Sequence, residues 1–180
     1  RLPLRHRHRH QTLRQTLRYA AVIGRQFSQA ALQQINAGHS ITDELQEAAA
    51  RGLIEADTSV GDNAWRFSHV LLRDAIYSSL LEDSRIPMHA IVGRALESVH
   101  AGWLDEVAET LAYHFSQANA PKQAAPYLIR AARKALQLYE LNEVEKLLKQ
   151  VHRLLQDNPD VVGQTEYDGM VVDWLETKIT

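Results

Sequence analysis

The sequence predicts a mostly α-helical protein, in which a winged helix-turn-helix with one small β-hairpin precedes an antiparallel helical array similar to tetratricopeptide (TPR) repeats. Three observations predict this fold. Apolar residues recur at helical spacing in three segments before residue 52. Two short β-like runs, 53–57 and 64–67, follow and are separated by turn residues. From residue 69 to the end of the sequence, apolar residues again recur at helical spacing.

The composition narrows the class of protein. With 45% hydrophobic and 23% charged residues, the 180-residue chain resembles an ordinary globular protein with room for one large or two small domains. Its net charge of −2 gives no general attraction to nucleic acid or to an anionic membrane. It has no cysteine and no run of about 18 apolar residues. We therefore expect a cytoplasmic protein, and the first residue, Arg1 rather than Met, predicts a piece of a longer chain.

The N-terminal residues contain a histidine at every second position, namely His6, His8 and His10. On a β-strand these three side chains would line one face and could bind a metal ion. The alternative interpretation is a solvated basic segment without a ligand, and this alternative is the one we favour.

Three helices are predicted before the hairpin. The first covers 13–23, and Gly24 ends it. Ser28 has the residue type of an N-cap and predicts a second, short helix after it. The third helix begins near Thr42 and ends at Gly52.

The hairpin leads directly into a helix, and His69 lies at the joint between them. This helix is predicted over 69–81, and a further one over 85–100. The first N–H groups of a helix and its partial positive charge favour an anion. The functional interpretation of His69 is therefore contact with a phosphate, and the structural one is a helix-start residue hydrogen-bonded to the wing.

The array is predicted from residue 104 onward, with helix starts near 105 and 142, close to the TPR period of about 34 residues. Pro121 suits the first turn of the second array helix. The proline usual at the end of a TPR repeat is replaced by Leu136. Small residues let paired helices approach, and large ones fill the space between them. The residues at such positions are Leu111, Ala112, Phe115, Ala124, Leu128 and Ala131.

Two surfaces of the array are candidate partner sites. The second array helix carries Lys122, Arg130, Arg133 and Lys134 on its polar side, either as a solvated face or as a groove for an acidic peptide. Trp174 belongs to the apolar stripe of the last helix. That stripe would pack back on the preceding helix, pair with a second copy of the chain or stay exposed.

A winged helix also suggests a DNA-binding transcriptional regulator, which is the alternative function. The helix that would read DNA, 41–51, carries three acidic residues and one base, Arg51. The wing holds Asp57 and Asp62 and no Lys or Arg in its turn. Both surfaces would repel phosphate, which argues against direct DNA binding.

No catalytic motif occurs in the sequence. It lacks the phosphate-binding loop Gly-x-x-x-x-Gly-Lys-Ser/Thr, the Gly-x-Ser-x-Gly motif and the His-Glu-x-x-His motif. Four histidines on or beside apolar stripes are interpreted as packing residues: His89, His100, His114 and His152. We therefore expect no catalysis, no metal site and no cofactor within these residues.

Five blocks of the sequence, in order, resemble the winged-helix and repeat region of the signal-transduction ATPases with numerous domains (STAND ATPases). The likeness is to those attached to bacterial nucleotidyl cyclases, protein kinases and transcription activators. The blocks are Leu17–Phe27, Leu45 to Ile54, Phe67–Leu81 with its Phe-Ser-His and Arg-Asp-x-x-Tyr residues, Met88–Glu97, and Leu111–Leu128.

The resemblance implies a domain order and partners. An upstream ATPase core would bind ATP or ADP, the winged-helix domain would fold back on it, and the repeats would sense a protein or small-molecule signal for an output domain. The implied division is 1–12 as the end of an upstream ATPase lid or linker, 13–82 as the winged-helix domain, 83–103 as a connecting helix, and 104–180 as TPR-like repeats.

The resemblance also implies a role for His69. In related switches the equivalent histidine contacts the diphosphate within a Met-His-Asp triplet. Here the triplet is Ser68-His69-Val70, so the histidine matches and its two neighbours do not. His69 is therefore the expected phosphate sensor, acting with the upstream core.

Overall fold

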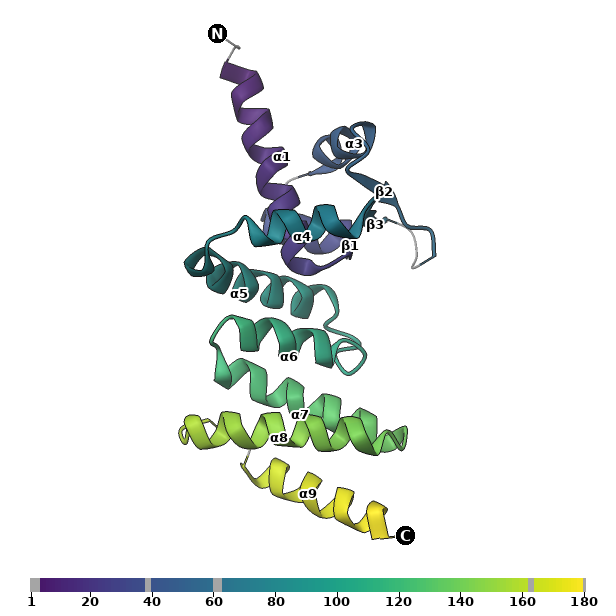
Figure 1. Ribbon diagram of the computed structural model, residues 1–180, viewed down its shortest axis with the longest axis vertical. Coiled ribbons are helices and arrows are strands. Elements are labelled where there is room, and N and C mark those ends of the chain that lie inside the picture. Colours follow the sequence, from purple (N-terminus) through teal and green to yellow (C-terminus); the bar gives the residue numbers. More distant parts are fainter. Residues whose placement is uncertain (1–3, 38–39, 60–62, 162–163, 180) are drawn as a thin grey trace. The chain divides into compact units, whose positions relative to one another are not determined.

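The computed structural model describes residues 4–37, 40–59, 63–161 and 164–179 (Figure 1). The chain forms two compact units, Arg1–Val99 and His100–Thr180. The elements of the first unit are α1 (Leu4–Ile23), β1 (Gln26–Ser28), α2 (Gln29–Ile35), α3 (Thr42–Ala50), β2 (Ile54–Ala56), β3 (Ala64–Phe67), α4 (Val70–Ser78) and α5 (Glu82–Val99). Those of the second unit are α6 (Ala108–Gln117), α7 (Pro121–Gln137), α8 (Leu141–Asp157) and α9 (Gln164–Ile179).

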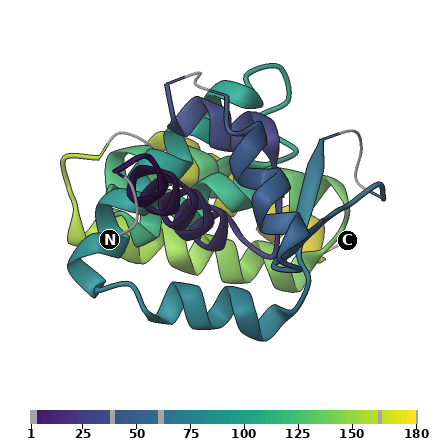
Figure 2. The same cartoon turned by 90° about the horizontal axis from the view of Figure 1, so that it is seen from above.

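The chain is mostly helical, as predicted, but its sheet has three strands where the sequence predicts a two-stranded hairpin. The strands are antiparallel in the order β1-β3-β2, and β2 and β3 lie side by side at the edge of the first unit (Figure 2). Strand β1 has only three residues, and its pairing partner β3 is remote in sequence. Phe27 of β1 packs its ring 5.5 Å from that of Phe67 of β3, so the extra strand closes the core.

Local signals place the helix ends of the first unit correctly. The Ser28 hydroxyl accepts a hydrogen bond from Ala31 N–H at 3.1 Å, which confirms the predicted N-cap of α2. After α3, Gly52 takes φ +69° and its N–H donates to the carbonyl of Ala49. The N–H of Leu53 donates to Ala48, which completes a turn that favours glycine at this position.

The strand that a metal site at His6, His8 and His10 would require does not form, because the backbone from Leu4 onward is helical and belongs to α1. Residues two apart share one face of a strand but do not face each other on a helix. The segment also has no β-branched residue to favour a strand. The side chains of His6, His8 and His10 lie outside the described residues, as does most of the wing turn at 60–62.

One hydrophobic core joins α1, α2, α3 and the sheet in the first unit. Helix α5, which we expected to connect two domains, packs against α1 and α2 inside this unit. The buried members of this core are Leu13, Ala20, Ala21, Phe27, Leu32, Ile41, Leu45, Ala48, Ile54 and Phe67.

In the second unit, two turns of the same kind join α6 to α7 and α7 to α8. Asn119 and Tyr139 have positive φ values of 51° and 57°. The following N–H groups, of Ala120 and Glu140, donate back to the carbonyls of Phe115 and Ala135 at 3.0 and 2.9 Å. These tight turns make consecutive helices reverse direction (Figure 1).

Small and large residues alternate where α6, α7 and α8 pack. Phe115 of α6 stacks on Tyr127 of α7 with ring centroids 5.8 Å apart, and Ala124 and Ala131 are fully buried. Pro121 occupies the first turn of α7, as predicted. Of the helices that the structure describes, none is both long and apolar enough to cross a membrane.

Candidate functional site

His69 lies at the joint between β3 and α4, where the sequence analysis places it. Backbone hydrogen bonds hold the end of β3 on both sides: Phe67 N–H donates to Arg25 O at 3.0 Å, and Ser68 N–H donates to Leu53 O at 3.1 Å. His69 is the N-cap residue of α4, with extended backbone angles of φ −135° and ψ 134°. The joint is therefore anchored from two neighbouring segments.

The imidazole of His69 is exposed and makes no capping hydrogen bond to its own helix. Within the described part of the chain the imidazole has no hydrogen-bond partner. No contact there supports the structural interpretation, in which His69 is hydrogen-bonded to the wing. Two apolar neighbours are also exposed, Val70 at 46% and Leu71 at 76%. The start of α4 therefore presents a histidine and two aliphatic side chains to the surroundings.

Arg73, one turn further along α4, ties this helix to α1. Its Nε donates to the carbonyl of Ala21 at 2.9 Å, across 52 residues of sequence. Its Nη1 lies 3.0 Å from the Asp74 carboxylate. The guanidinium also lies over the ring of Tyr77, 4.8 Å from its centroid. Arg73 thus fixes the position of α4, and with it the position of His69.

Tyr77 is the centre of a second set of contacts, which reaches α5. The guanidinium of Arg85 lies 4.8 Å from the Tyr77 ring centroid. Arg85 Nε also donates to Leu80 O at 3.0 Å, and its Nη2 donates to Ser78 O at 3.1 Å. The Tyr77 hydroxyl lies 2.9 Å from Nε2 of His89, which is 1% exposed.

Burial lowers the pKa of His89 to about 4, and the positive charges of Arg73 and Arg85 act in the same direction. His89 is therefore neutral at physiological pH, and its ring serves as a hydrogen-bonding partner inside the fold. This agrees with its interpretation as a packing histidine. Together, Arg73, Tyr77, Arg85 and His89 form what we call the α4–α5 cluster.

Sequence reasoning missed this cluster as a unit. Arg73, Tyr77 and His89 stand in the blocks that resemble STAND ATPases, whereas Arg85 lies between two of them. Of the four, only His89 has a role predicted from the sequence, as a packing residue. The spacing of Arg73 and Tyr77, four apart on one helix, is a usable signal for a stacked pair. The contacts with Arg85 and His89 cross from one helix to the next, and no local pattern predicts them.

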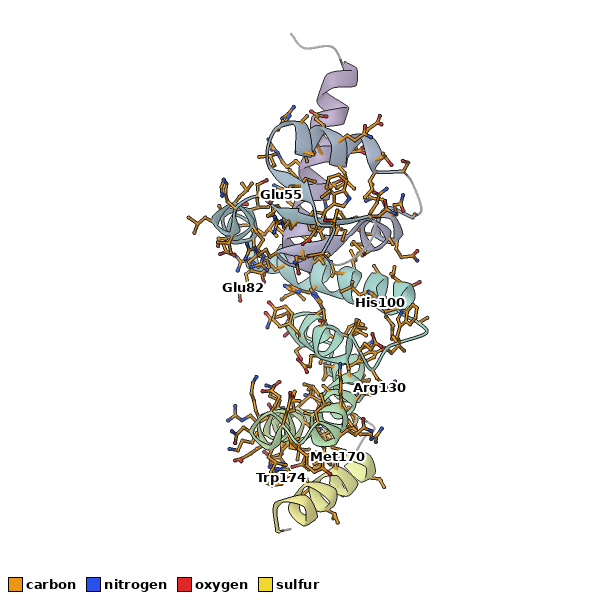
Figure 3. All side chains as sticks on the ribbon, turned by 90° about the vertical axis from the view of Figure 1, so that its right-hand side faces the viewer. Glu55, Glu82, His100, Arg130, Met170 and Trp174 are labelled. Carbon is orange, nitrogen blue, oxygen red and sulfur yellow. The ribbon has the colours of Figure 1, made fainter. Side chains whose placement is uncertain are left out.

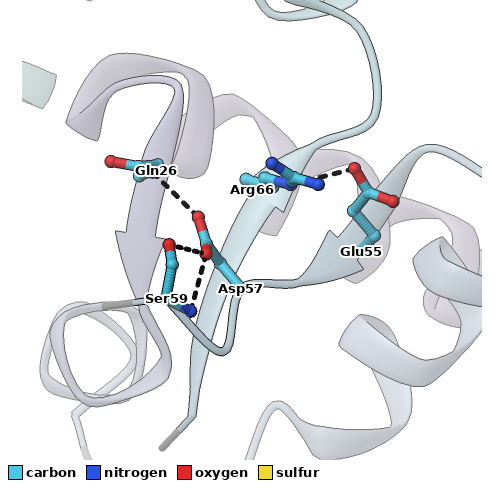
Figure 4. A network of polar contacts seen from close by, with 5 residues as sticks. All are labelled: Gln26, Glu55, Asp57, Ser59 and Arg66. Atoms are coloured by element: carbon cyan, nitrogen blue, oxygen red, sulfur yellow. Dashed lines mark hydrogen bonds and ion pairs between the residues drawn. The ribbon is translucent and has the colours of Figure 1, made fainter. Parts of the chain in front are cut away.

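The sheet carries a separate polar network, shown in Figure 4. Asp57, at the end of β2, accepts hydrogen bonds from the hydroxyl and the N–H of Ser59 and from Nε2 of Gln26 at 2.8 Å. These bonds, above all that from the Ser59 hydroxyl, lower the pKa of Asp57. Arg66, on β3, pairs with Glu55 on β2 at 2.9 Å. The basic side chain of Arg66, on the β2–β3 pair, is thus already paired with an acidic one.

The basic residues of α7 divide into two pairs. Arg130, labelled in Figure 3, forms an ion pair with Asp105 at 2.7 Å, and Lys134 Nζ lies 3.5 Å from the carbonyl of Glu106. Lys122 and Arg133 are exposed. Two of the four predicted basic residues therefore make contacts within the second unit, and the other two are exposed and available for a partner.

The stripe on α9 packs back on its own unit, which is one of the three alternatives that the sequence left open. Met170 is 2% exposed, and Tyr167 stacks on His152 of α8 with ring centroids 5.8 Å apart. Trp174, labelled with Met170 in Figure 3, is half-buried. Val172 is 53% exposed, so part of α9 still faces outward.

Among the residues that the structure describes, no three His, Asp or Glu side chains come together in a way that could hold a metal ion. No protein-family model, no curated protein and no solved structure matches this chain.

Proposed function

We propose that this chain is a regulatory and protein-interaction segment of a STAND-type ATPase switch. In this role it relays nucleotide state, and the binding of a partner or signal, to an output domain such as a cyclase, a kinase or a transcription activator. The observation that carries the proposal is the placement of His69, whose imidazole is exposed at the N-cap of α4 and makes no hydrogen bond to the described residues.

The start of α4 has the properties that recognition of a diphosphate requires. A helix N-terminus supplies N–H groups and a partial positive charge, and a histidine beside it adds a side-chain donor. The nucleotide itself would be bound by an ATPase core outside these residues, because the sequence has no phosphate-binding loop. His69 would then report whether the diphosphate is present.

The α4–α5 cluster gives a physical route for the relay. Arg73 attaches α4 to the backbone of α1, and Tyr77 attaches it to His89 of α5. A shift of α4 on loss of the diphosphate would therefore strain contacts with both helices. Since α5 ends at Val99, where the first unit ends, such a shift would reach the segment that leads to the helical array.

The helical array is the proposed site of partner or signal binding, since stacked helices present extended surfaces to other molecules. The exposed bases Lys122 and Arg133 are candidates for contacts with acidic groups of that partner. The alternative, a DNA-binding regulator, has less support. Arg51 at the end of α3 is paired with Glu47, and the first turn of that helix is acidic.

The test uses the full-length protein that contains the ATPase core. His69→Ala should speed ADP dissociation and raise basal output by about ten-fold or more, because one charge-assisted hydrogen bond contributes roughly 1.5–3 kcal/mol. His69→Asn is the matched control for a capping role, since asparagine is a strong N-cap but lacks the imidazole. His89→Ala should lower stability without favouring either state.

The two roles of His69 give different results. If His69→Ala and His69→Asn both speed ADP loss, the phosphate-sensing role is supported. If both variants fold and retain ADP as the wild type does, His69 is a helix-start residue and the proposal is wrong. A full-length protein without an ATPase core would also contradict the proposal.

A further inference from the structure

The first unit contains an open pocket of about 670 Å³ that has no part in the function proposed above. Its residues come from α1, from the end of α3 and the start of β2, and from α4. They are Leu13, Arg14, Leu17, Arg18, Arg51, Leu53, Ile76 and Ser79. The volume lies within the range of about 300–1,000 Å³ that is usual for ligand sites.

The floor of this pocket is aliphatic. Leu13 is a buried member of the core, and Leu17, Leu53 and Ile76 are half-buried against it. The hydrophobic core of the first unit therefore has an opening here, where three half-buried aliphatic side chains, those of Leu17, Leu53 and Ile76, remain in reach of an incoming apolar group. Filling it would remove apolar surface from water.

The rim of the pocket is positively charged, and no carboxylate is found among the described residues that line it. Arg51 is paired with Glu47. By contrast, Arg14 and Arg18 have no ion pair within the described part of the chain. The lack of a nearby acid reflects an uneven distribution of charge along the sequence, since the first 42 residues include seven arginines and no Asp or Glu.

The arginines and leucines of α1 form two parallel rows of equal period. Leu13 and Leu17 are one helical turn apart, and so are Arg14 and Arg18, which is about 6 Å along the axis. A second helix lying along α1 repeats its own side chains with this same spacing. An amphipathic helix could thus place apolar residues on the floor and carboxylates on the two arginines.

We propose that this pocket, the α1 groove, binds an acidic amphipathic helix of a partner protein. The helix would supply two apolar residues one turn apart, seated over Leu17, Leu53 and Ile76, and carboxylates that pair with Arg14 and Arg18. Charge complementarity selects the occupant, since an uncharged or basic helix would leave two guanidiniums beside an apolar contact without a counter-charge. The proposal does not depend on the STAND assignment.

The probe is a fluorescein-labelled helical peptide of about 18 residues, long enough to fold in water, with leucines on one face and glutamates flanking them. Its binding to the full 180-residue chain is followed by fluorescence anisotropy at about 150 mM salt, where long-range attraction is screened. Arg14→Glu/Arg18→Glu should weaken binding at least ten-fold.

The matched control is Arg25→Glu/Arg94→Glu, which changes the net charge equally at exposed positions outside the groove. Circular dichroism checks that both double variants fold. Peptides with glutamine for glutamate, or with serine for leucine, should each lose binding, because the groove requires both features. Equal weakening by the two double variants would overturn the proposal, as would an affinity for the glutamate peptide weaker than about 1 mM.

Sedimentation of the chain without peptide tests the other occupant. If the chain self-associates, if Arg14→Glu/Arg18→Glu abolishes this association, and if the peptide does not bind, then a second copy occupies the groove and the partner-helix proposal is wrong. A monomeric chain that binds the glutamate peptide through Arg14 and Arg18 supports the proposal.

Discussion

The buried histidine of the α4–α5 cluster makes the stability of the first unit depend on pH. The pKa of His89 falls from 6.5 to about 4 on folding, because burial and two arginines disfavour its charged form. Above pH 6.5 the ring is neutral in both the folded and the unfolded chain, and its contribution to stability is fully present. Below 6.5 the unfolded chain takes up a proton that the folded chain does not, so stability falls until about pH 4.

The size of this effect follows from the two pKa values. Each unit of pKa difference corresponds to about 1.4 kcal/mol. If the whole shift contributes, the free energy of unfolding falls by about 2 kcal/mol between about pH 7.5 and 5. Solvent reaches both arginine side chains in part, which reduces their share of the shift. We therefore expect a loss of about 1 to 2 kcal/mol from this one residue over that range.

The assay compares the wild type with His89→Gln, whose amide can still reach the Tyr77 hydroxyl but does not titrate. Urea unfolding is followed by the fluorescence of Trp65, which belongs to the first unit, in a background with phenylalanine at positions 103 and 174. This local probe is needed because a chain of two compact units need not unfold in one step.

The free energy of unfolding of the wild type should fall by about 1 to 2 kcal/mol more than that of His89→Gln between about pH 7.5 and 5. His69→Gln, at an exposed histidine of the same unit, is the control for a histidine-to-glutamine change as such. Equal pH dependence of the wild type and His89→Gln would refute the reasoning, as would an NMR titration in which His89 protonates near 6.5 in the folded chain.

Three further outcomes are expected of this chain. The 180-residue chain should neither bind ATP tightly nor hydrolyse it, because it has no phosphate-binding loop; micromolar affinity by calorimetry or steady phosphate release would contradict this. It should not bind duplex DNA specifically in anisotropy titrations at about 150 mM salt, since the first turn of α3 is acidic and Arg51 and Arg66 are already paired; sub-micromolar, sequence-dependent binding would overturn this. Trp174→Glu should loosen α9 and alter self-association while leaving the first unit folded, which hydrogen exchange and sedimentation would report. Unchanged exchange throughout α9 would show that Trp174 has no packing role.

The sequence by itself predicted those features that depend on residues close together in the chain. Ser28 and Pro121 mark helix starts, and Gly52 marks a helix end, because a cap or a positive φ is a property of the local backbone. The order of three helices, a β-ribbon and a helical array followed from changes in the apolar period. The position of His69 at a strand–helix joint followed in the same way.

Only the tertiary structure decided the features that depend on residues distant in sequence. Strand β1 is three residues long and exists through its pairing with β3, so no local propensity reveals it. The helical state of the histidine-rich segment reflects its continuity with α1 rather than its alternating pattern. The hydrogen bond from Arg73 to Ala21 and the α1 groove also depend on residues distant in sequence. The walls of the groove come from segments more than 60 residues apart. Periodicity shows which side of a helix is apolar, but which segment packs against that side, and where it leaves an opening, is determined by the folded chain as a whole.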